Sequence, residues 1–325
     1  RPRDASRLLD LTGGKIADKS IRDLPGIFQP NDLLVINDTR VIPSRLKGHR
    51  ENVKIEVTLH KRLDTGIWAA FARPAKRLKQ GDKIVFNNTF EAKVQSRNAG
   101  EVILDFQADD QIILEELHKV GRMPLPPYIK RSELSKSELD QQDYQSIFAE
   151  RLGAVAAPTA SLHFTPALLN EIKSQGVKQV NITLHVGAGT FLPITTSDSD
   201  DHRMHSEWAE LTNNAISLII KTKKNGGRVI ALGTTVLRVL ETAALNGELR
   251  AFSGETDLFI TPGFTFNVVD LLLTNFHQPR STLIMLVAAF AGTDRILEAY
   301  EYAKNNGYRF LSYGDACLIE NINKV

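Results

Sequence analysis

The hydrophobic pattern of this chain changes along its length, and the change limits the folds that the chain can adopt. Residues 53–60 read Val-Lys-Ile-Glu-Val-Thr-Leu-His, in which apolar and polar residues alternate strictly. This period of two is typical of a strand with one buried face. Four further short runs of strand-forming residues follow, separated by turn residues: 67–71, 83–86, 90–94 and 102–106. The stretch therefore predicts a small antiparallel β-barrel.

From about residue 155 the pattern becomes one of strands that alternate with helices, which is typical of an α/β domain. The segments expected to continue it are strands at 179–186, 228–232 and 316–319, helices at 212–224, 281–290 and 293–306, a helix that ends at 244, and a run at 256–261. Another strand, at 33–36, precedes the barrel stretch. We therefore expect the α/β class, with a larger α/β domain of residues 1–45 and 112–325 and an inserted small antiparallel β-barrel domain of residues 46–111.

Two connecting segments follow the expected barrel. Residues 111–120 have the pattern of a helix, and the next segment contains Pro124, Pro126 and Pro127, which favour an extended strap. Residues 131–143 are polar, so we expect them to form an exposed excursion.

Length and composition exclude several classes of protein. The chain has 325 residues, which favours two domains, and its longest apolar run, residues 283–291, is far shorter than the roughly 20 residues of a membrane-spanning helix. The single cysteine, Cys317, excludes an internal disulfide and Cys-x-x-Cys zinc sites. The chain begins with neither a signal peptide nor a methionine, so we expect further residues before it and no secretion. These features favour a cytoplasmic protein with no membrane partner, and we expect a monomer.

Positive charge is concentrated in the barrel stretch. Between Arg40 and Lys83 the chain has twelve Lys or Arg residues against four Asp or Glu residues, whereas the whole chain has a net charge of only +2. Such a concentration is typical of a surface that contacts a polyanion such as RNA. We name Lys76, Arg77 and Lys79 as candidate RNA contacts. The alternative is a solvated face with no partner.

Several familiar cofactor motifs are absent. The chain has no Gly-x-x-x-x-Gly-Lys-Ser/Thr and no Gly-x-Ser-x-Gly, and the glycines at 187 and 189 lack the third glycine of a dinucleotide-binding loop. His202, His205 and Glu207 lie close in sequence, but their spacing differs from His-Glu-x-x-His. We therefore expect no metal site.

Polar residues are concentrated where strands are expected to end, which is where open α/β sheets bind ligands. The candidates for substrate binding, which include three arginines suited to carboxylate or phosphate, are Asn37, Arg40, Arg122, Thr159, His163, His185, Gly187, Gly189, Thr190, Thr234, Thr235, Asn275 and Arg280. Each has a structural alternative, since such residues also cap helices, satisfy turns and form buried hydrogen bonds.

Ten segments carry a resemblance to a known family. They are residues 3–9, 35–43, 121–129, 153–160, 184–191, 202–207, 233–235, 256–263, 273–277 and 312–316, among them Val-Ile-Asn-Asp-Thr-Arg-Val-Ile-Pro and Leu-His-Val-Gly-Ala-Gly-Thr-Phe. With these segments the chain resembles the S-adenosylmethionine:tRNA ribosyltransferase-isomerase family of queuosine biosynthesis, over essentially its whole length. Ser161 and Leu271 stand where we expect glycine in this family, and Gln278 where we expect leucine.

The resemblance implies an activity. Proteins of this family transfer and isomerise the ribosyl group of S-adenosylmethionine onto 7-aminomethyl-7-deazaguanine at the wobble position of tRNA, giving epoxyqueuosine-tRNA and releasing adenine and methionine. S-adenosylmethionine is then a consumed substrate, and neither a metal nor a cofactor is implied.

The implied chemistry requires one base and one acid. Asp38, His205, Glu207 and His277 are the candidates, because each lies inside a matching segment and has a side chain that can exchange a proton. Two alternatives remain open: an S-adenosylmethionine-dependent RNA methyltransferase and a non-catalytic RNA-binding protein.

Overall fold

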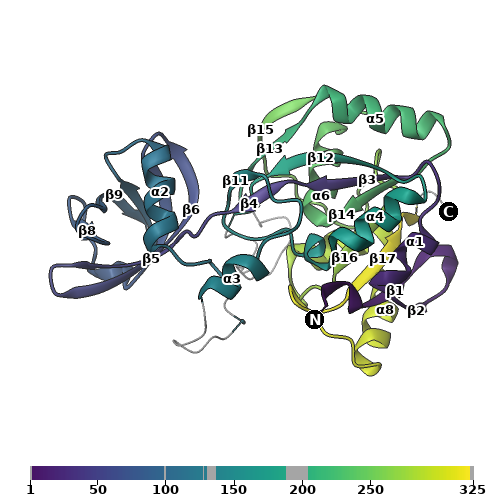
Figure 1. The fold of residues 1–325 in the computed structure, drawn as a ribbon, viewed down its shortest axis with the longest axis horizontal. Coiled ribbons are helices and arrows are strands. Elements are labelled where there is room, and N and C mark those ends of the chain that lie inside the picture. Colours follow the sequence, from purple (N-terminus) through teal and green to yellow (C-terminus); the bar gives the residue numbers. More distant parts are fainter. Residues whose placement is uncertain (1, 99, 127, 130–136, 188–203, 323–325) are drawn as a thin grey trace.

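The structure is a computed structural model that describes residues 2–98, 100–126, 128–129, 137–187 and 204–322. A closed barrel lies beside a larger part in which a sheet carries helices on both faces (Figure 1). The chain enters the barrel after residue 44 and leaves it after α2 (Asp110–Val120). None of the described helices combines the length and the apolar character needed to cross a bilayer. The α/β class with an inserted antiparallel barrel is confirmed.

The barrel closes through six antiparallel strands in the order β10-β7-β6-β5-β8-β9. They are β5 (Arg45–Arg50), β6 (Val53–Asp64), β7 (Ile67–Arg73), β8 (Lys83–Val85), β9 (Glu91–Asn98) and β10 (Glu101–Asp105). The alternation in β6 buries Ile55, Val57 and Leu59, as predicted. Ile113 and Leu117 of α2 pack into the same core. The division at residue 111 stays a proposal, and this packing favours placing it after α2.

The larger sheet has nine strands in the order β15-β13-β12-β3-β14-β16-β17-β1-β2. They are β15 (Phe252–Thr256), β13 (Glu207–Leu211), β12 (Lys178–Leu184), β3 (Leu33–Asn37), β14 (Val229–Leu232), β16 (Leu271–Asn275), β17 (Ala316–Glu320), β1 (Arg7–Asp10) and β2 (Ala17–Ser20). The four central strands, β12, β3, β14 and β16, are parallel, so their carboxyl ends meet at one edge. Helices cover both faces, which explains why β3, β14 and β16 are buried throughout.

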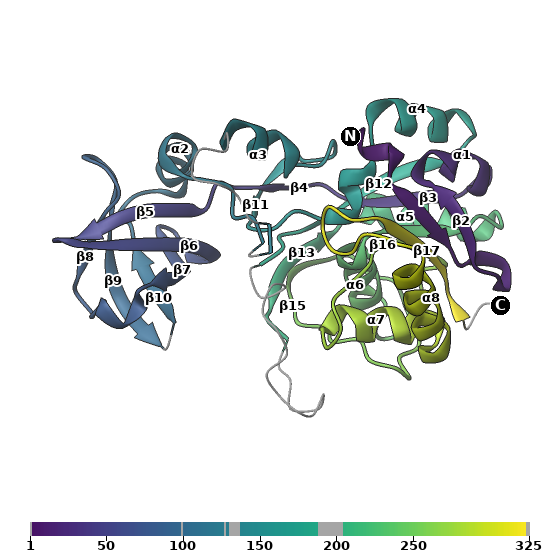
Figure 2. The ribbon, with the colours of Figure 1, turned by 90° about the horizontal axis from the view of Figure 1, so that it is seen from below.

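Two hydrophobic clusters lie on opposite faces of this sheet, since Leu33 and Val35 of β3 belong to one and Leu34 and Ile36 to the other. The helices α5 (Asn213–Lys224), α6 (Thr234–Ala243), α7 (Thr282–Ala291) and α8 (Thr293–Asn305) pack into the first cluster, and α1 (Leu24–Ile27) and α4 (Pro166–Ser174) into the second. Figure 2 shows α1 and α4 on the opposite side of the sheet from α6, α7 and α8. The result is a three-layer α/β part.

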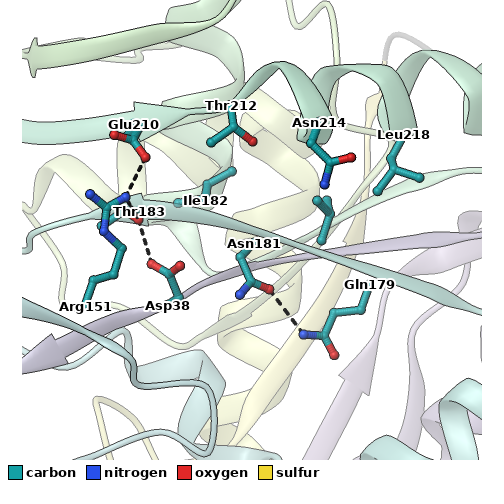
Figure 3. A pocket seen from close by; sticks show the side chains of 11 residues that line it. Asp38, Arg151, Gln179, Asn181, Ile182, Thr183, Glu210, Thr212, Asn214 and Leu218 are labelled. Carbon is teal, nitrogen blue, oxygen red and sulfur yellow. Dashed lines mark hydrogen bonds and ion pairs between the residues drawn. The ribbon is translucent and has the colours of Figure 1, made fainter.

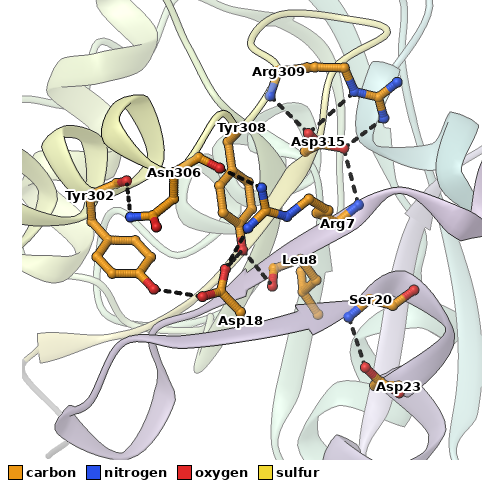
Figure 4. A network of polar contacts seen from close by, with 10 residues as sticks. All are labelled: Arg7, Leu8, Asp18, Ser20, Asp23, Tyr302, Asn306, Tyr308, Arg309 and Asp315. Carbon is orange, nitrogen blue, oxygen red and sulfur yellow. Dashed lines mark hydrogen bonds and ion pairs between the residues drawn. The ribbon is translucent and has the colours of Figure 1, made fainter.

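The first and last strands of the chain pair with each other, because β1 runs parallel to β17. A polar network fixes this edge (Figure 4). Asp18 of β2 accepts hydrogen bonds from the hydroxyls of Tyr302 (2.6 Å) and Tyr308 (2.5 Å) and forms an ion pair with Arg7, and these contacts lower the pKa of Asp18. The backbone N–H of Arg7 donates to Asp315, at 3.1 Å. Segments almost 300 residues apart are thereby held together.

The structure adds detail to several expectations. Within the polar segment 131–143, which we expect to be an exposed excursion, residues Ser137–Asp143 form a helix, α3, while 130–136 lie outside the described residues. The run at 256–261 is not a strand, because β15 ends at Thr256. Ser161 and Leu271 do not occupy the left-handed backbone region, so no strain arises where glycine was expected. Ser161 lies in the 3-10 helix Thr159–His163, and Leu271 begins β16.

Candidate functional site

A cavity of about 570 Å³ lies between the barrel and the larger sheet. The barrel lines it with residues from β6 and β7, including His60 and Trp68. The larger part lines it with residues that follow β12 and open β13, including His185, Gly187 and Glu207. Three candidate site residues are therefore brought together here, and the facing wall comes from the inserted domain. The volume lies within the roughly 300–1,000 Å³ that small-molecule sites occupy.

His185 is fixed on the wall that the sheet provides. Its Nδ1 lies 2.8 Å from the hydroxyl of Thr39, and its ring stacks on Trp208 with 5.1 Å between centroids. Gly153 lies against the ring, since a Cβ at this position would be 2.7 Å from the imidazole Nε2. Burial lowers the pKa of His185 to about 4, so the ring is neutral at pH 7.

Glu207 is buried and fully engaged. One carboxylate oxygen accepts a hydrogen bond from the backbone N–H of Gly187 (2.8 Å), and the other contacts the guanidinium of Arg238, which is itself only 3% exposed. Arg238 also donates from Nε to the carbonyl of Leu258, at 3.2 Å. Glu207 therefore holds a strand end and a helix together. Sequence reasoning missed Arg238, although an arginine between the apolar residues of α6 is a signal of a buried partner.

Asp38 lies in a second, smaller cavity of about 310 Å³ (Figure 3). Its carboxylate accepts a hydrogen bond from the hydroxyl of Thr183, at 2.7 Å. The same hydroxyl accepts a hydrogen bond from the guanidinium of Arg151, which also forms an ion pair with Glu210. Burial raises the pKa of Asp38. The Arg151 guanidinium also lies 5.3 Å from the ring centroid of Trp208, so this residue contacts the walls of both cavities. Asp38 and Glu207 consequently line different cavities.

Asn37 connects three elements at the carboxyl end of β3. Its amide oxygen accepts from the backbone N–H groups of Thr39 (3.1 Å) and Leu184 (3.0 Å), and its Nδ2 donates to the carbonyl of Leu184 and, at 3.5 Å, to the hydroxyl of Thr235. Thr234 and Thr235 begin α6, directly after Gly233 at φ 96°. Asn37 is completely buried, so these contacts position the strand ends.

A buried polar group lies at the end of β16. Asn275 accepts from the hydroxyl of Thr159 (2.9 Å), and its Nδ2 lies 3.1 Å from Nε2 of His163. His277 contacts the hydroxyl of Thr274 through Nε2, at 3.1 Å. Burial lowers the pKa of His163 and of His277 to about 4. None of these four candidates lines the first cavity.

The remaining candidates are exposed or not described. His205 is exposed next to Ser206, which lines the first cavity. The side chains of Arg40, Arg122 and Arg280 are exposed and form no hydrogen bond or ion pair with the described residues, and the same holds for Lys76, Arg77 and Lys79 of the loop between β7 and β8. Gly189 and Thr190 lie outside the described residues.

Comparisons with known proteins identify the family of this chain. A family model described as queuosine biosynthesis protein matches residues 1–319. The chain belongs to this family. Curated relatives named S-adenosylmethionine:tRNA ribosyltransferase-isomerase include those of Methylocella silvestris (52% identity, covering 98% of this chain and 92% of the relative) and Maricaulis maris (50%, covering 98% and 94%).

A solved structure gives the same result for the fold. The crystal structure of the S-adenosylmethionine tRNA ribosyltransferase of Thermotoga maritima matches with a TM-score of 0.54 and 36% identity, covering 98% of this chain and 94% of that one. The assignment to the queuosine family, and the expectation that the chain is an enzyme of this family, are thereby confirmed. The methyltransferase and the non-catalytic RNA-binding protein find no support in these relatives.

Proposed function

We propose that this protein transfers and isomerises the ribosyl group of S-adenosylmethionine onto 7-aminomethyl-7-deazaguanine at the tRNA wobble position, with release of adenine and methionine. The cavity between the barrel and the sheet is the observation that supports a location for the proposed active site. It has the size of a small-molecule site, and family segments supply His185, Gly187 and Glu207 to its wall. The barrel faces it from the other side, so an RNA bound along the barrel can present one base to it.

The chemistry requires proton exchange at two places. A sulfonium acidifies the hydrogens of the adjacent ribose carbon, so a base can act there, and adenine leaves more readily when its nitrogen is protonated. Of the four acid–base candidates, we propose His205 for direct action, because it is exposed beside the cavity. Asp38 and His277 remain candidates for the second role. Glu207 acts indirectly, by positioning the backbone amide of Gly187 and the guanidinium of Arg238.

We also propose that the enzyme needs no metal and no bound cofactor. The reaction is redox-neutral overall, and the positive sulfonium of S-adenosylmethionine already activates the bonds that break. We also propose a cytoplasmic location, because the chain has a single cysteine and the proposed substrate is a tRNA, and we propose that the protein is a monomer. Light scattering of the purified protein measures its molecular mass and so tests the monomeric state.

The decisive experiment incubates the protein with S-adenosylmethionine labelled in the adenine and an anticodon stem-loop that carries the deazaguanine. Free adenine and an RNA heavier by the isomerised ribosyl group are expected, with the same rate in the presence of EDTA. His205→Ala is expected to lower turnover by about 10² or more, the usual scale for a general acid or base. S-adenosylhomocysteine and a methylated RNA, without free adenine, would refute the proposal.

A further inference from the structure

Strand β6 presents one residue outside its regular pairing. Leu59 pairs with Ala70 of β7 and Lys61 with Ala69, so His60, between them, is the extra residue of a β-bulge. Bulges turn a side chain away from the direction that alternation would give it, and they are frequent next to active sites. His60 lines the cavity between the barrel and the sheet.

Two neighbours fix the imidazole of His60. The ring stacks on Phe71 of β7, with 4.3 Å between centroids and 20° between planes, and Nε2 lies 2.8 Å from a carboxylate oxygen of Glu101 on β10. Nε2 is buried, and its contact with Glu101 is a close charge contact without the geometry of a hydrogen bond, whereas Nδ1 is not among the buried unpartnered atoms and has no hydrogen bond to a described residue. Among the described residues, Nδ1 is therefore the ring nitrogen that is left open towards the cavity that His60 lines.

The charged groups around His60 determine its protonation. Burial is the largest effect and disfavours the charged ring, as do the neighbouring His205 and Lys61, whereas Glu101 favours it, so the pKa of His60 is lowered. The ring is neutral at pH 7. A carboxylate 2.8 Å from Nε2 favours the tautomer with its proton on that nitrogen, which leaves the lone pair on Nδ1.

The wall of the larger part comes very close at this point. A Cβ placed on Gly187 would lie 3.9 Å from the backbone oxygen of His60, and the ammonium of Lys61 lies 3.0 Å from the carboxylate of Glu255 on β15. His60 and the residues after β12 therefore share one site. The barrel contributes a proton-accepting group to it, in addition to any surface for RNA.

We propose that His60 accepts the proton of the substrate's aminomethyl group during ribosyl transfer, and that Glu101 is its positioning residue. The inference rests on the proposed function. A primary alkylammonium resembles that of lysine, with a pKa of about 10.4, so at pH 7 it must lose a proton before it is a nucleophile. One N–H bond breaks and its electron pair stays on nitrogen, while the proton binds Nδ1 of His60 and the ring becomes imidazolium. The freed pair then forms the nitrogen–carbon bond to the ribosyl group as the bond from that group to adenine breaks, and the electron pair of the broken bond leaves with adenine, which takes up a proton.

The test measures single-turnover formation of ribosylated stem-loop as a function of pH. His60→Ala is expected to lower the rate at pH 7 by about 10² to 10³, on the scale of a lost general base. The loss is expected to shrink as the pH rises towards 9.5, because the substrate amine then deprotonates in solution, and added imidazole is expected to restore part of the rate at pH 7. Glu101→Gln is expected to give a smaller loss with the same pH trend.

Two control variants make the result decisive. His49→Ala alters an exposed histidine of the same barrel and is expected to leave the rate unchanged. His60→Gln replaces the alanine variant if circular dichroism shows that the latter does not fold. A loss that is the same at every pH and insensitive to imidazole would overturn the role of His60, as would a rate equal to that of wild type. Absence of adenine release by the wild-type protein would instead refute the proposed function.

Discussion

At the scale of single residues, the contact between Glu207 and Arg238 is the clearest case of a polar pair on which stability depends. Both side chains are at most 4% exposed, so the loss of one partner leaves the other as a buried, unpaired group. Glu207→Gln keeps the shape of the side chain but removes its charge. We expect it to lower the free energy of unfolding by about 3–5 kcal/mol, measured by urea denaturation.

Glu248→Gln is the matched control for this prediction. Glu248 pairs with Arg250, and both side chains are 73% exposed, so solvent screens the pair and no measurable change in stability is expected. Equal stabilities of the two variants would show that the buried pair contributes nothing beyond an exposed one.

Gly153 makes room for the imidazole of His185. An added Cβ would lie 2.7–2.8 Å from three atoms of that ring, and the backbone φ of 150° is one that other residues rarely adopt. Gly153→Ala is therefore expected to displace the ring and to lower kcat/KM by about 10², the usual result of misplacing a site group by about 1 Å. Gly254→Ala, where the added Cβ meets no atom within 4 Å, is the control and should retain activity.

The sequence predicted some residues of the candidate site and missed others for a physical reason. His185, Gly187 and Glu207 lie in segments that carry the resemblance to the family, and the fold brings them into one cavity. His60 and Arg238 were missed because their roles depend on contacts between residues distant in sequence. His60 is the last residue of a regular alternating pattern in the sequence, and the bulge is visible only in the pairing of β6 with β7.

At the scale of elements, the segment directly after strand β16 contains a buried histidine that must stay neutral. The pKa of His277 is about 4 in the folded protein, against about 6.5 in an unfolded chain. Protonation of His277 therefore favours the unfolded state. The contribution of the neutral ring to the free energy of unfolding is fully present above pH 6.5 and is lost as the pH falls towards 4. For a shift of this size the loss is of the order of 3 kcal/mol.

His277→Gln should accordingly flatten the decline of unfolding free energy between pH 6.5 and 4.5, as followed by urea denaturation at each pH. The comparison is with wild type, because carboxylates protonate in the same range in both proteins. His118→Gln, on the exposed face of α2, should keep the slope of wild type. An unchanged slope in the His277 variant would contradict the assignment of this acid sensitivity to the buried ring.

Elements with clear periodicity were predicted, and so were the buried strands β3 and β14, but the buried strand β16 was not. The alternating strand at residues 53–60 was recognised because it has one solvated face, as were helices with capping residues such as Thr212, whose hydroxyl accepts from the backbone N–H of Ala215. β16 is buried on both faces, so Leu271, Leu272 and Leu273 form an apolar run with no period. Its place in the sheet follows from pairing with β14 and β17, which local sequence does not encode.

At the scale of the whole molecule, the cavity and the loop between β7 and β8, which we call the basic loop, lie at opposite ends of strand β7. Trp68, near the start of β7, lines the cavity, whereas Lys76, Arg77 and Lys79 follow its end at Arg73. Seven residues at a rise of about 3.3 Å separate the two ends by roughly 20 Å. An RNA stem that contacts the loop would therefore run along the barrel towards the cavity.

Replacing Lys76, Arg77 and Lys79 together by alanine tests whether this loop binds RNA. Each phosphate that loses its partner lowers the slope of log affinity against log salt by about 0.7 to 0.9, so the triple change should reduce the slope by about 2 to 3 and weaken stem-loop binding most at low salt. Affinity for S-adenosylmethionine, measured by calorimetry, should stay unchanged, because the cavity is at the other end of β7.

The matched control replaces three exposed lysines of the larger part, Lys173, Lys221 and Lys224, which removes the same charge from helices α4 and α5. If both triple variants lower the salt slope equally, only net charge matters and the barrel loop is no specific contact. If the barrel variant keeps the slope of wild type, its charges form a solvated face. The RNA contacts would then lie elsewhere, and Arg122, exposed where the chain leaves α2, is the first position to test.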